Sequence, residues 1–196
     1  MPTRTLVIAS GNAGKLREFA ELLSDLPLEV QPQPAGMEVE ETGSTFADNA
    51  RIKARAVATA TGHWALADDS GLSVEALNGA PGVYSARYAD SDQARIDRLL
   101  RELGESRNRK AHFCAALCIA SPDGTVLVEV EGRCDGLITT AARGNQGFGY
   151  DPIFEVIGTG QTFAEMNAPA KQVHGHRGRA FKLLEPRLRQ LLESVG

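Results

Sequence analysis

Residues 111–133 read AHFCAALCIASPDGTVLVEVEGR. Two apolar segments, 111–120 and 126–133, flank the turn Ser121-Pro122-Asp123-Gly124, and this arrangement predicts an antiparallel hairpin. Upstream of the hairpin, strand patterns alternate with helix patterns, as they do in α/β proteins. A hairpin that follows such alternation predicts an α/β fold whose sheet is mixed and is flanked by helices.

The remaining elements are predicted from apolar spacing and capping residues. Thr45 and Asp48 resemble a capping box at the start of a helix. Pro186 is predicted to kink or split the last helix. The predicted strands are 5–9, 28–30 and 64–68, and the predicted helices are 16–23, 45–61, 93–103 and one that begins near residue 177.

Size and composition restrict the function. The 196 residues suit one domain, 1–196, with two lobes around a cleft. A formal net charge of -4 argues against an extended nucleic-acid surface. The three cysteines have no metal-type spacing, and neither a signal-peptide pattern nor a membrane-length apolar segment is visible. We therefore expect a cytoplasmic protein that binds neither nucleic acid nor membranes.

Asp68 and Asp69 follow an apolar strand pattern and precede Ser70-Gly71. We expect the strand to stop here, at a sheet edge where ligands usually bind. Consecutive residues of an extended chain point to opposite faces, so the two acids are expected to have different roles. One of them can hold a metal or activate water, whereas the alternative is an Asx-turn with a solvated acid.

The segment Ser10-Gly11-Asn12-Ala13-Gly14-Lys15 joins the first strand to the first helix. Glycines and the free amides of a helix start favour binding of a phosphate, and Lys15 adds positive charge. The segment is not a Walker loop, because Leu16 stands where that motif needs Ser or Thr. The alternative is an ordinary turn with a helix N-cap.

Glu38, Glu40 and Glu41 form an acidic loop just before the helix at 45–61. Such a run is commonly a solvated face. The functional interpretation pairs Glu40 with Asp69 around a hard cation, and oxygen ligands favour Mg²⁺. A divalent ion would also offset the repulsion between carboxylates and a triphosphate.

Two further segments predict ligand binding near the C-terminus. Gly147-Phe148-Gly149-Tyr150-Asp151-Pro152 places aromatic rings among glycines, which suits stacking on a flat ligand or, alternatively, a tight turn with Phe148 in the core. The cations Lys171, His176, Arg177 and Arg179 gather at the entry to the last helix. Cations at a helix start oppose the macrodipole, so a nearby anion is expected.

Taken in order, these segments resemble those of the inosine triphosphate pyrophosphatase family, in its bacterial XTP/dITP diphosphatase form. The resemblance covers essentially the whole chain. It rests on residues 10–12 with Lys15, 40–43, 45–46 with 49–50, 67–71, 79–87, 148–154 and 176–178.

The resemblance implies a mixed α/β fold with an elongated sheet, two lobes around a central cleft, and a homodimer. It implies hydrolysis of ITP, dITP and XTP to the monophosphate and pyrophosphate. Magnesium ligands fall on Glu40 and Asp69, and Asp69 and Lys15 are the catalytic residues. Substrate-binding positions fall on Ser10, Gly11, Asn12, Ala13, Gly14, Lys15, Ser70, Phe148, Gly149, Tyr150, Asp151, Lys171, His176 and Arg177.

Two alternatives stay open. One is a pyrophosphatase for modified pyrimidine nucleotides, like the septum-formation inhibitor family, although that family has Ser-Pro-Arg-Arg after its first strand. The other is a nucleotide sensor without turnover, which would gain nothing from carboxylates placed beside phosphate. The segment His174-Gly175 departs from the family pattern and affects expectations about contacts near the base.

Overall fold

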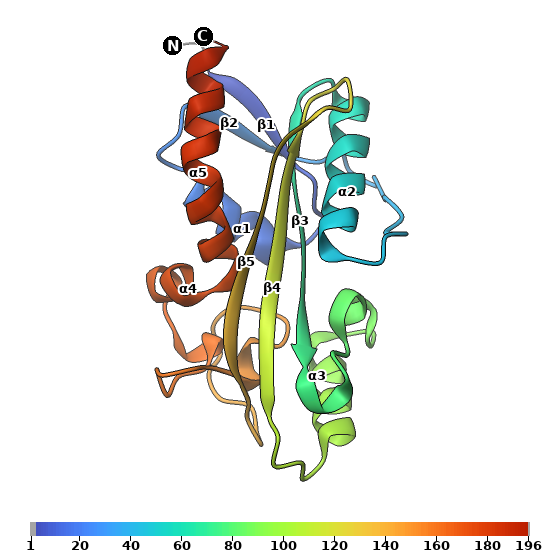
Figure 1. Ribbon diagram of the computed structural model, residues 1–196, viewed down its shortest axis with the longest axis vertical. Helices are drawn as coiled ribbons and strands as arrows, with labels where there is room; N and C mark the ends of the chain where they lie inside the picture. Colours follow the sequence, from blue (N-terminus) through green and yellow to red (C-terminus); the bar gives the residue numbers. More distant parts are fainter. Residues whose placement is uncertain (1–2, 196) are drawn as a thin grey trace. The chain divides into compact units, whose positions relative to one another are not determined.

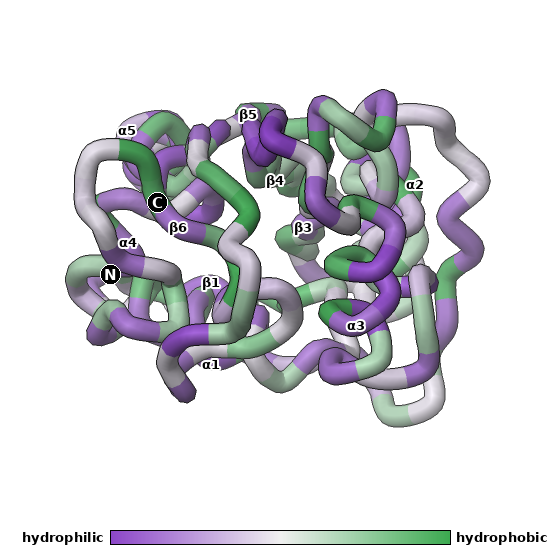
Figure 2. Tube along the Cα trace, turned by 90° about the horizontal axis from the view of Figure 1, so that it is seen from below, coloured by the Kyte–Doolittle hydropathy of each residue, from purple (hydrophilic) through white to green (hydrophobic). Residues whose placement is uncertain are grey.

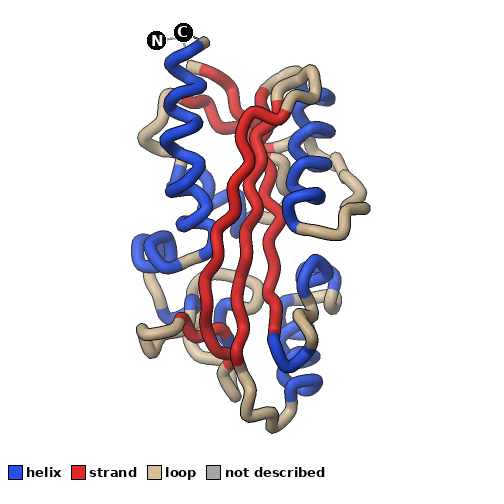
Figure 3. Tube along the Cα trace, viewed as in Figure 1, coloured by secondary structure: helices blue, strands red, loops and turns tan. Residues whose placement is uncertain are grey.

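The computed structural model describes residues 3–195 and contains one six-stranded mixed sheet (Figures 1 and 3). Strands β1 and β2 are parallel, β1 and β3 are parallel, and β5 and β6 are antiparallel. The sheet order is β2-β1-β3-β4-β5-β6. The strands are β1 (Arg4–Ile8), β2 (Leu28–Pro32), β3 (Trp64–Val74), β4 (Lys110–Ala120), β5 (Val126–Ile138) and β6 (Phe154–Val156). The predicted α/β fold with a mixed sheet is confirmed.

The hairpin of β4 and β5 is also confirmed. The two strands are neighbours in the sheet, and the turn between them is closed by backbone bonds. The Ser121 N–H donates to Thr125 O (2.9 Å), and the Gly124 N–H donates to Ser121 O (2.9 Å). Gly124 has a φ of 87°, a left-handed conformation that glycine adopts without strain.

Residues 3–195 also contain five α-helices. Thr45 caps α2 through a hydrogen bond from the Asp48 N–H (3.1 Å), as predicted. Hydrophobic and hydrophilic residues alternate along α3, whose inward residues are buried (Figure 2). The helices are α1 (Ala13–Leu22), α2 (Phe46–Thr61), α3 (Asp92–Leu103), α4 (Ala168–His174) and α5 (His176–Ser194), and the short 3₁₀ helices are η1 (Glu75–Leu77), η2 (Gly82–Arg87), η3 (Asp151–Ile153) and η4 (Phe163–Glu165).

Helix α5 begins one residue before its predicted start and continues through Pro186 as one helix, so the expected split does not occur. No helix within residues 3–195 combines the length and the apolar composition needed to cross a membrane. Cys118 and Cys134 are buried and pack as small apolar residues, whereas Cys114 is half-buried. Burial raises the pKa of Cys118 to about 12 and that of Cys134 to about 11, so neither thiol is reactive.

Strand β3 is longer than the sequence predicted. It continues through Asp68, Asp69, Ser70 and Gly71 to Val74, so the prediction that it stops there is wrong. The neighbouring strand β1 pairs with β3 only as far as Leu66 and then turns into the loop before α1. The two acids therefore lie just beyond the carboxyl end of β1, a position where α/β sheets commonly bind ligands.

The chain forms two compact units with separate apolar clusters. Unit 1 comprises residues 1–69, 116–131 and 180–196, and unit 2 comprises residues 70–115 and 132–179. In unit 1, small residues of α2 pack against β1, β3 and β4. In unit 2, aliphatic and aromatic side chains pack together, and the rings of Phe113, Phe154 and Phe163 contact one another.

Candidate functional site

The loop between β1 and α1 is a compact turn in unit 1. The Asn12 N–H donates to Ser10 Oγ (3.1 Å), and Asn12 Oδ1 accepts from the Lys15 N–H (3.0 Å). Asn12 is thus the N-cap of α1. The first amides of a helix have no acceptor within the helix, so this exposed turn offers donors to an anion.

Lys15 does not extend freely into solvent, because its Nζ lies 2.8 Å from Asp68 Oδ1. The Asp68 side chain is fully buried, and the Lys15 side chain is only 16% exposed. Removing either partner would leave a buried charge uncompensated. Asp68 therefore holds Lys15 beside the turn, whereas Asp69, on the opposite face of β3, has different partners.

Asp69 is 5% exposed and lies beside Lys53 of α2, with a distance of 3.6 Å between Asp69 Oδ1 and Lys53 Nζ. Burial raises the pKa of Asp69 from 3.8 to about 6. The positive charge of Lys53 opposes this rise, Glu41 adds to it, and Lys15 opposes it. Asp69 thus titrates close to neutral pH, as a general base needs to.

The Lys53 ammonium group contacts oxygen atoms of three acidic residues. Its Nζ donates to Asp68 O (2.6 Å) and lies 3.2 Å from Glu41 Oε1, in addition to its contact with Asp69. Our sequence interpretation missed this residue. A signal was present, because Lys53 falls in the inward stripe of α2 among Ala50, Ala54 and Val57. A lysine in a buried stripe usually has an acidic partner.

Asn49, one turn before Lys53, completes the surroundings of Asp69. Asn49 is fully buried and its Oδ1 accepts from the Gly43 N–H (2.7 Å), which ties the acidic loop to α2. A Cβ at Gly43 would lie 2.7 Å from Asn49 Oδ1, so only glycine fits. The Asn49 side chain also lowers the pKa of Asp69. Even so, Asn49 Nδ2 and Asp69 Oδ2 are buried and lack a partner with hydrogen-bond geometry among the described residues.

Asp69 and the acidic loop at 38–41 do not form a complete set of protein ligands for a metal. Within residues 3–195, no group of three or more His, Cys, Asp and Glu side chains is arranged to hold a metal. A pair of carboxylates suits Mg²⁺, which keeps waters and binds substrate phosphates. The structure brings Glu41 to Lys53 beside Asp69. Glu40 is exposed and makes no hydrogen bond or ion pair with the described part of the chain.

In unit 2, a half-buried aromatic ring lies beside two cations. Lys171 Nζ is 4.6 Å from the centroid of the Phe148 ring, and the guanidinium carbon of Arg177 is 5.8 Å from it. Arg177 is 3% exposed and its Nη2 donates to Ser70 Oγ of β3 (2.9 Å). The aromatic loop and the start of α5, far apart in sequence, therefore meet at Phe148.

Asp151 holds this loop together. Its buried Oδ2 accepts from Lys171 Nζ (2.7 Å) and from the Phe148 N–H (3.0 Å). Gly147 has a φ of 72°, and a Cβ there would overlap Asp151 Oδ2. Glycine is required at this position both for its backbone conformation and for the approach of the carboxylate.

Tyr150 has a positioning role rather than an exposed surface for stacking. It is 5% exposed, belongs to the apolar cluster of unit 2, and donates its hydroxyl to Ser85 O of η2 (2.7 Å). Burial raises the pKa of the Tyr150 hydroxyl. Gly149 is anchored from outside the loop, because its N–H donates to Asp92 Oδ2 (3.0 Å) at the start of α3. Ser85 and Asp92 were not predicted, because each contact depends on a distant segment.

His176 is also buried, at 4% exposure, and its ring stacks on Phe113 with centroids 4.6 Å apart and planes at 12°. Helix α5 starts close to α4, since a Cβ at Gly178 would overlap Gln172 O. The cations at this helix start have protein acceptors: Arg177 contacts Ser70, and Arg179 donates to Arg133 O (3.2 Å). These bonds stabilise the cations near the positive end of the helix dipole.

Comparisons with known proteins agree with this arrangement. The model of the Ham1 family matches residues 6–187. A dITP/XTP pyrophosphatase of Synechococcus sp. (strain CC9311) is 70% identical over 194 residues, covering 99% of this chain and 94% of that protein. The structure of a HAM1 protein from Coxiella burnetii matches with a TM-score of 0.86 and 41% identity, covering 96% of this chain and all of that one.

A third comparison gives the same result. The crystal structure of a nucleoside-triphosphatase / dITP/XTP pyrophosphatase from Mycobacterium abscessus matches with a TM-score of 0.72 and 42% identity. The match covers 93% of this chain and 99% of that one. The fold is therefore that of the proteins matched.

Proposed function

The chain belongs to the Ham1 family, and on this premise we propose that it hydrolyses dITP, ITP and XTP to the nucleoside monophosphate and pyrophosphate. The observation that carries the proposal is Asp69, a buried carboxylate whose pKa of about 6 suits a proton acceptor and which lies beside Lys53. A relative 70% identical to this chain is named for the same reaction.

In the proposed reaction, water attacks the α-phosphorus and its proton passes to Asp69. The bond between the α-phosphorus and the bridging oxygen breaks, and pyrophosphate leaves with the electron pair. Glu40 and Asp69 are the proposed ligands of Mg²⁺, which would supply positive charge to the phosphate oxygens. The buried Oδ2 of Asp69, which lacks a hydrogen-bond donor among the described residues, supports this assignment.

The phosphates are assigned to the turn at Ser10–Gly14, to Lys15 and to Lys171. The exposed amides and Asn12 cap of the turn support the first assignment. Lys15 and Lys171 each have one carboxylate partner, Asp68 and Asp151 respectively. These partners hold the two ammonium groups in place, and the positive charge of each lysine would stabilise the charge that develops on the leaving group.

The base is assigned to Phe148, with Gly149, Asp151, His176 and Arg177 around it and Tyr150 holding the loop. Phe148 offers a ring for stacking, and Arg177 and His176 offer donors to a 6-oxo group. Adenine presents an amino group at that edge, which would leave a buried donor unpaired. An unmade buried hydrogen bond lowers affinity about five- to a hundredfold per contact, so selection against ATP follows.

We propose in addition that the protein is a homodimer that acts in the cytoplasm. A single chain has a mass of 20.9 kDa, so sedimentation equilibrium should give twice this value. A monomer at micromolar concentration would contradict the dimer without affecting the proposed chemistry.

The test of the reaction is release of pyrophosphate from dITP, ITP, XTP, GTP, ATP and a modified pyrimidine triphosphate, with and without Mg²⁺. We expect turnover of the first three only, and only with the metal. Asp69→Asn should lose almost all turnover, whereas Asp123→Asn, which changes an exposed acid of the hairpin turn, should not. Wild-type rates in Asp69→Asn, or preferred turnover of the pyrimidine, would contradict the proposal.

A matched pair of variants identifies the second acid of the metal site. Glu40→Gln should raise the Mg²⁺ concentration needed for half-maximal rate, because it removes a proposed ligand. Glu41→Gln should change that concentration little and should instead lower the pKa of Asp69, since Glu41 raises it. The reverse pattern would assign the metal to Glu41, the acid that the structure places against Lys53.

A further inference from the structure

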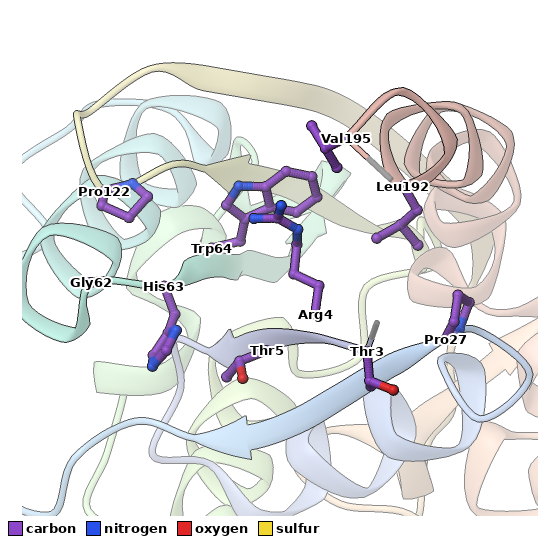
Figure 4. Close-up of a pocket in the computed structure, with 10 residues that line it drawn as sticks. All are labelled: Thr3, Arg4, Thr5, Pro27, Gly62, His63, Trp64, Pro122, Leu192 and Val195. Carbon is purple, nitrogen blue, oxygen red and sulfur yellow. The ribbon is translucent and has the colours of Figure 1, made fainter. Parts of the chain in front are cut away.

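A cavity of about 290 Å³ lies in unit 1, and none of the residues assigned to the nucleotide lines it (Figure 4). Its walls come from the start of β1, the first residue of β3, and the end of α5. Arg4 and Trp64, which line the cavity, lie in the middle of the view in Figure 4, and Leu192 and Val195 lie beside them.

Arg4 provides the positive charge of this cavity. Its guanidinium carbon lies 4.2 Å from the centroid of the Trp64 ring, which is a cation–π contact. The Arg4 side chain makes no hydrogen bond or ion pair with any other residue of 3–195, so its guanidinium N–H donors are not used by the described protein. Among residues 3–195, no Asp or Glu lines the cavity, although the chain as a whole is anionic.

Apart from Arg4 and His63, the side chains that line the cavity are apolar or carry hydroxyl groups. Pro27, Pro122 and Leu192 offer apolar surface, and the Thr5 hydroxyl is a further donor. A guanidinium held over an aromatic ring is fixed in place, and its planar fork of donors matches a carboxylate. The volume is at the lower limit of ligand sites, so the ligand must be small.

We propose that this cavity binds a small organic carboxylate, with the carboxylate on Arg4 and a compact apolar body against the prolines and Leu192. The inference does not depend on the proposed hydrolysis, because no residue is shared between the two sites. A ligand of this size is expected to bind with a Kd of about 1 mM.

Trp64 makes a direct test possible, because it is the only tryptophan of the chain. We would titrate the full-length protein with benzoate and follow tryptophan emission at constant ionic strength. Benzyl alcohol and benzylammonium are the matched neutral and cationic probes. The proposal expects a saturable change with benzoate that is weaker or missing with the other two.

Variants test the role of Arg4. Arg4→Met should weaken benzoate binding about ten- to hundredfold, since it removes charged hydrogen bonds to the carboxylate. Arg101→Met, which changes an exposed arginine of α3, should bind benzoate like the wild type. If circular dichroism shows that Arg4→Met is unfolded, Arg4→Lys serves instead: it keeps the charge, loses the fork and should also weaken binding.

Several results would overturn the inference. They are an equal response to benzyl alcohol, no saturable response to benzoate, or unchanged benzoate affinity in a folded Arg4 variant. If inorganic phosphate binds as tightly as benzoate, the proposal of an organic carboxylate is contradicted, because phosphate has no apolar group to contact the prolines and Leu192. Measuring dITP turnover on the same samples separates this outcome from failure of the proposed hydrolysis, since neither benzoate nor Arg4→Met should alter turnover.

Discussion

Asp69 carries a negative charge that its surroundings disfavour. Burial is the largest influence on its pKa and raises it to about 6, while Lys53 and Lys15 only partly compensate. Between about pH 4 and 6 the unfolded chain loses this proton before the folded protein does. The folded state therefore loses stability as the pH rises through this range, by on the order of 1–3 kcal/mol.

Asp69→Asn should stabilise the metal-free protein above pH 6 and have little effect near pH 4. The amide removes the buried charge, whose cost exists only where Asp69 is ionised. Urea unfolding in EDTA at pH 8, 6 and 4.5 would measure the difference. Asp123→Asn, an exposed acid, is the control and should show no such gain. A variant less stable than the wild type at pH 8 would contradict the account of Asp69 as a strained functional residue.

Lys53 lowers the pKa of Asp69, although Lys53 itself is not among the residues assigned to the nucleotide. Lys53→Met should raise the pKa of Asp69 above its present value of about 6, because Lys53 is the largest influence that lowers it. The acid limb of the kcat/KM profile for dITP should move up by about one pH unit or more. Lys182→Met, on the exposed face of α5, should leave the profile unchanged.

At the scale of elements, the aromatic loop depends on anchors in other segments. Its own residues supply the internal bonds of Asp151, while η2 holds Tyr150 and α3 holds Gly149. Each anchor fixes a different point of the loop. Two residues of this loop that are only two positions apart can therefore differ strongly in how well they tolerate substitution.

Gly147 and Gly149 provide a matched pair for this idea. Both have positive φ, 72° and 62°, so alanine is strained at either position. A Cβ at Gly147 would also overlap Asp151 Oδ2, whereas nothing lies within 4 Å of a Cβ at Gly149. Gly147→Ala should raise the KM for dITP at least tenfold more than Gly149→Ala, through loss of the Asp151–Lys171 contact. Equal effects would mean that backbone strain alone matters.

At the scale of the molecule, the fold itself pairs the buried acids with lysines. The described residues contain no assembled group of three or more metal-type side chains, and Asp68, Asp69 and Glu41 each contact a lysine. Structural metal sites, in contrast, supply much of the folding free energy of the proteins that contain them.

Removal of metal should therefore separate activity from stability. Dialysis against EDTA should abolish dITP hydrolysis, and added Mg²⁺ should restore it. The Tm of the metal-free protein should stay within about 2 °C of that of the untreated protein, because only weak binding free energy is lost. A large fall in Tm would show that a metal stabilises the fold, contrary to the open carboxylate pair seen around Lys53.

The sequence by itself determined the features that depend on neighbouring residues. The Ser121–Gly124 turn, the Thr45 cap and the mixed order of strands and helices follow from local propensities, and the structure confirms each. The family also followed from short strings of residues, since strings of this kind occur together in few proteins. The different ion-pair partners of Asp68 and Asp69 also agree with the alternation of side chains along a strand.

Only the tertiary structure decided which side chains meet. Lys53 reaches Asp69 because α2 packs on β3, Glu41 rather than Glu40 contacts that lysine, and Tyr150 points into the core. Strand β3 continues past its acids, although turn residues predicted an end. The reason is physical: these outcomes are set by packing between segments distant in sequence, and that packing overrides the local preferences that a sequence displays.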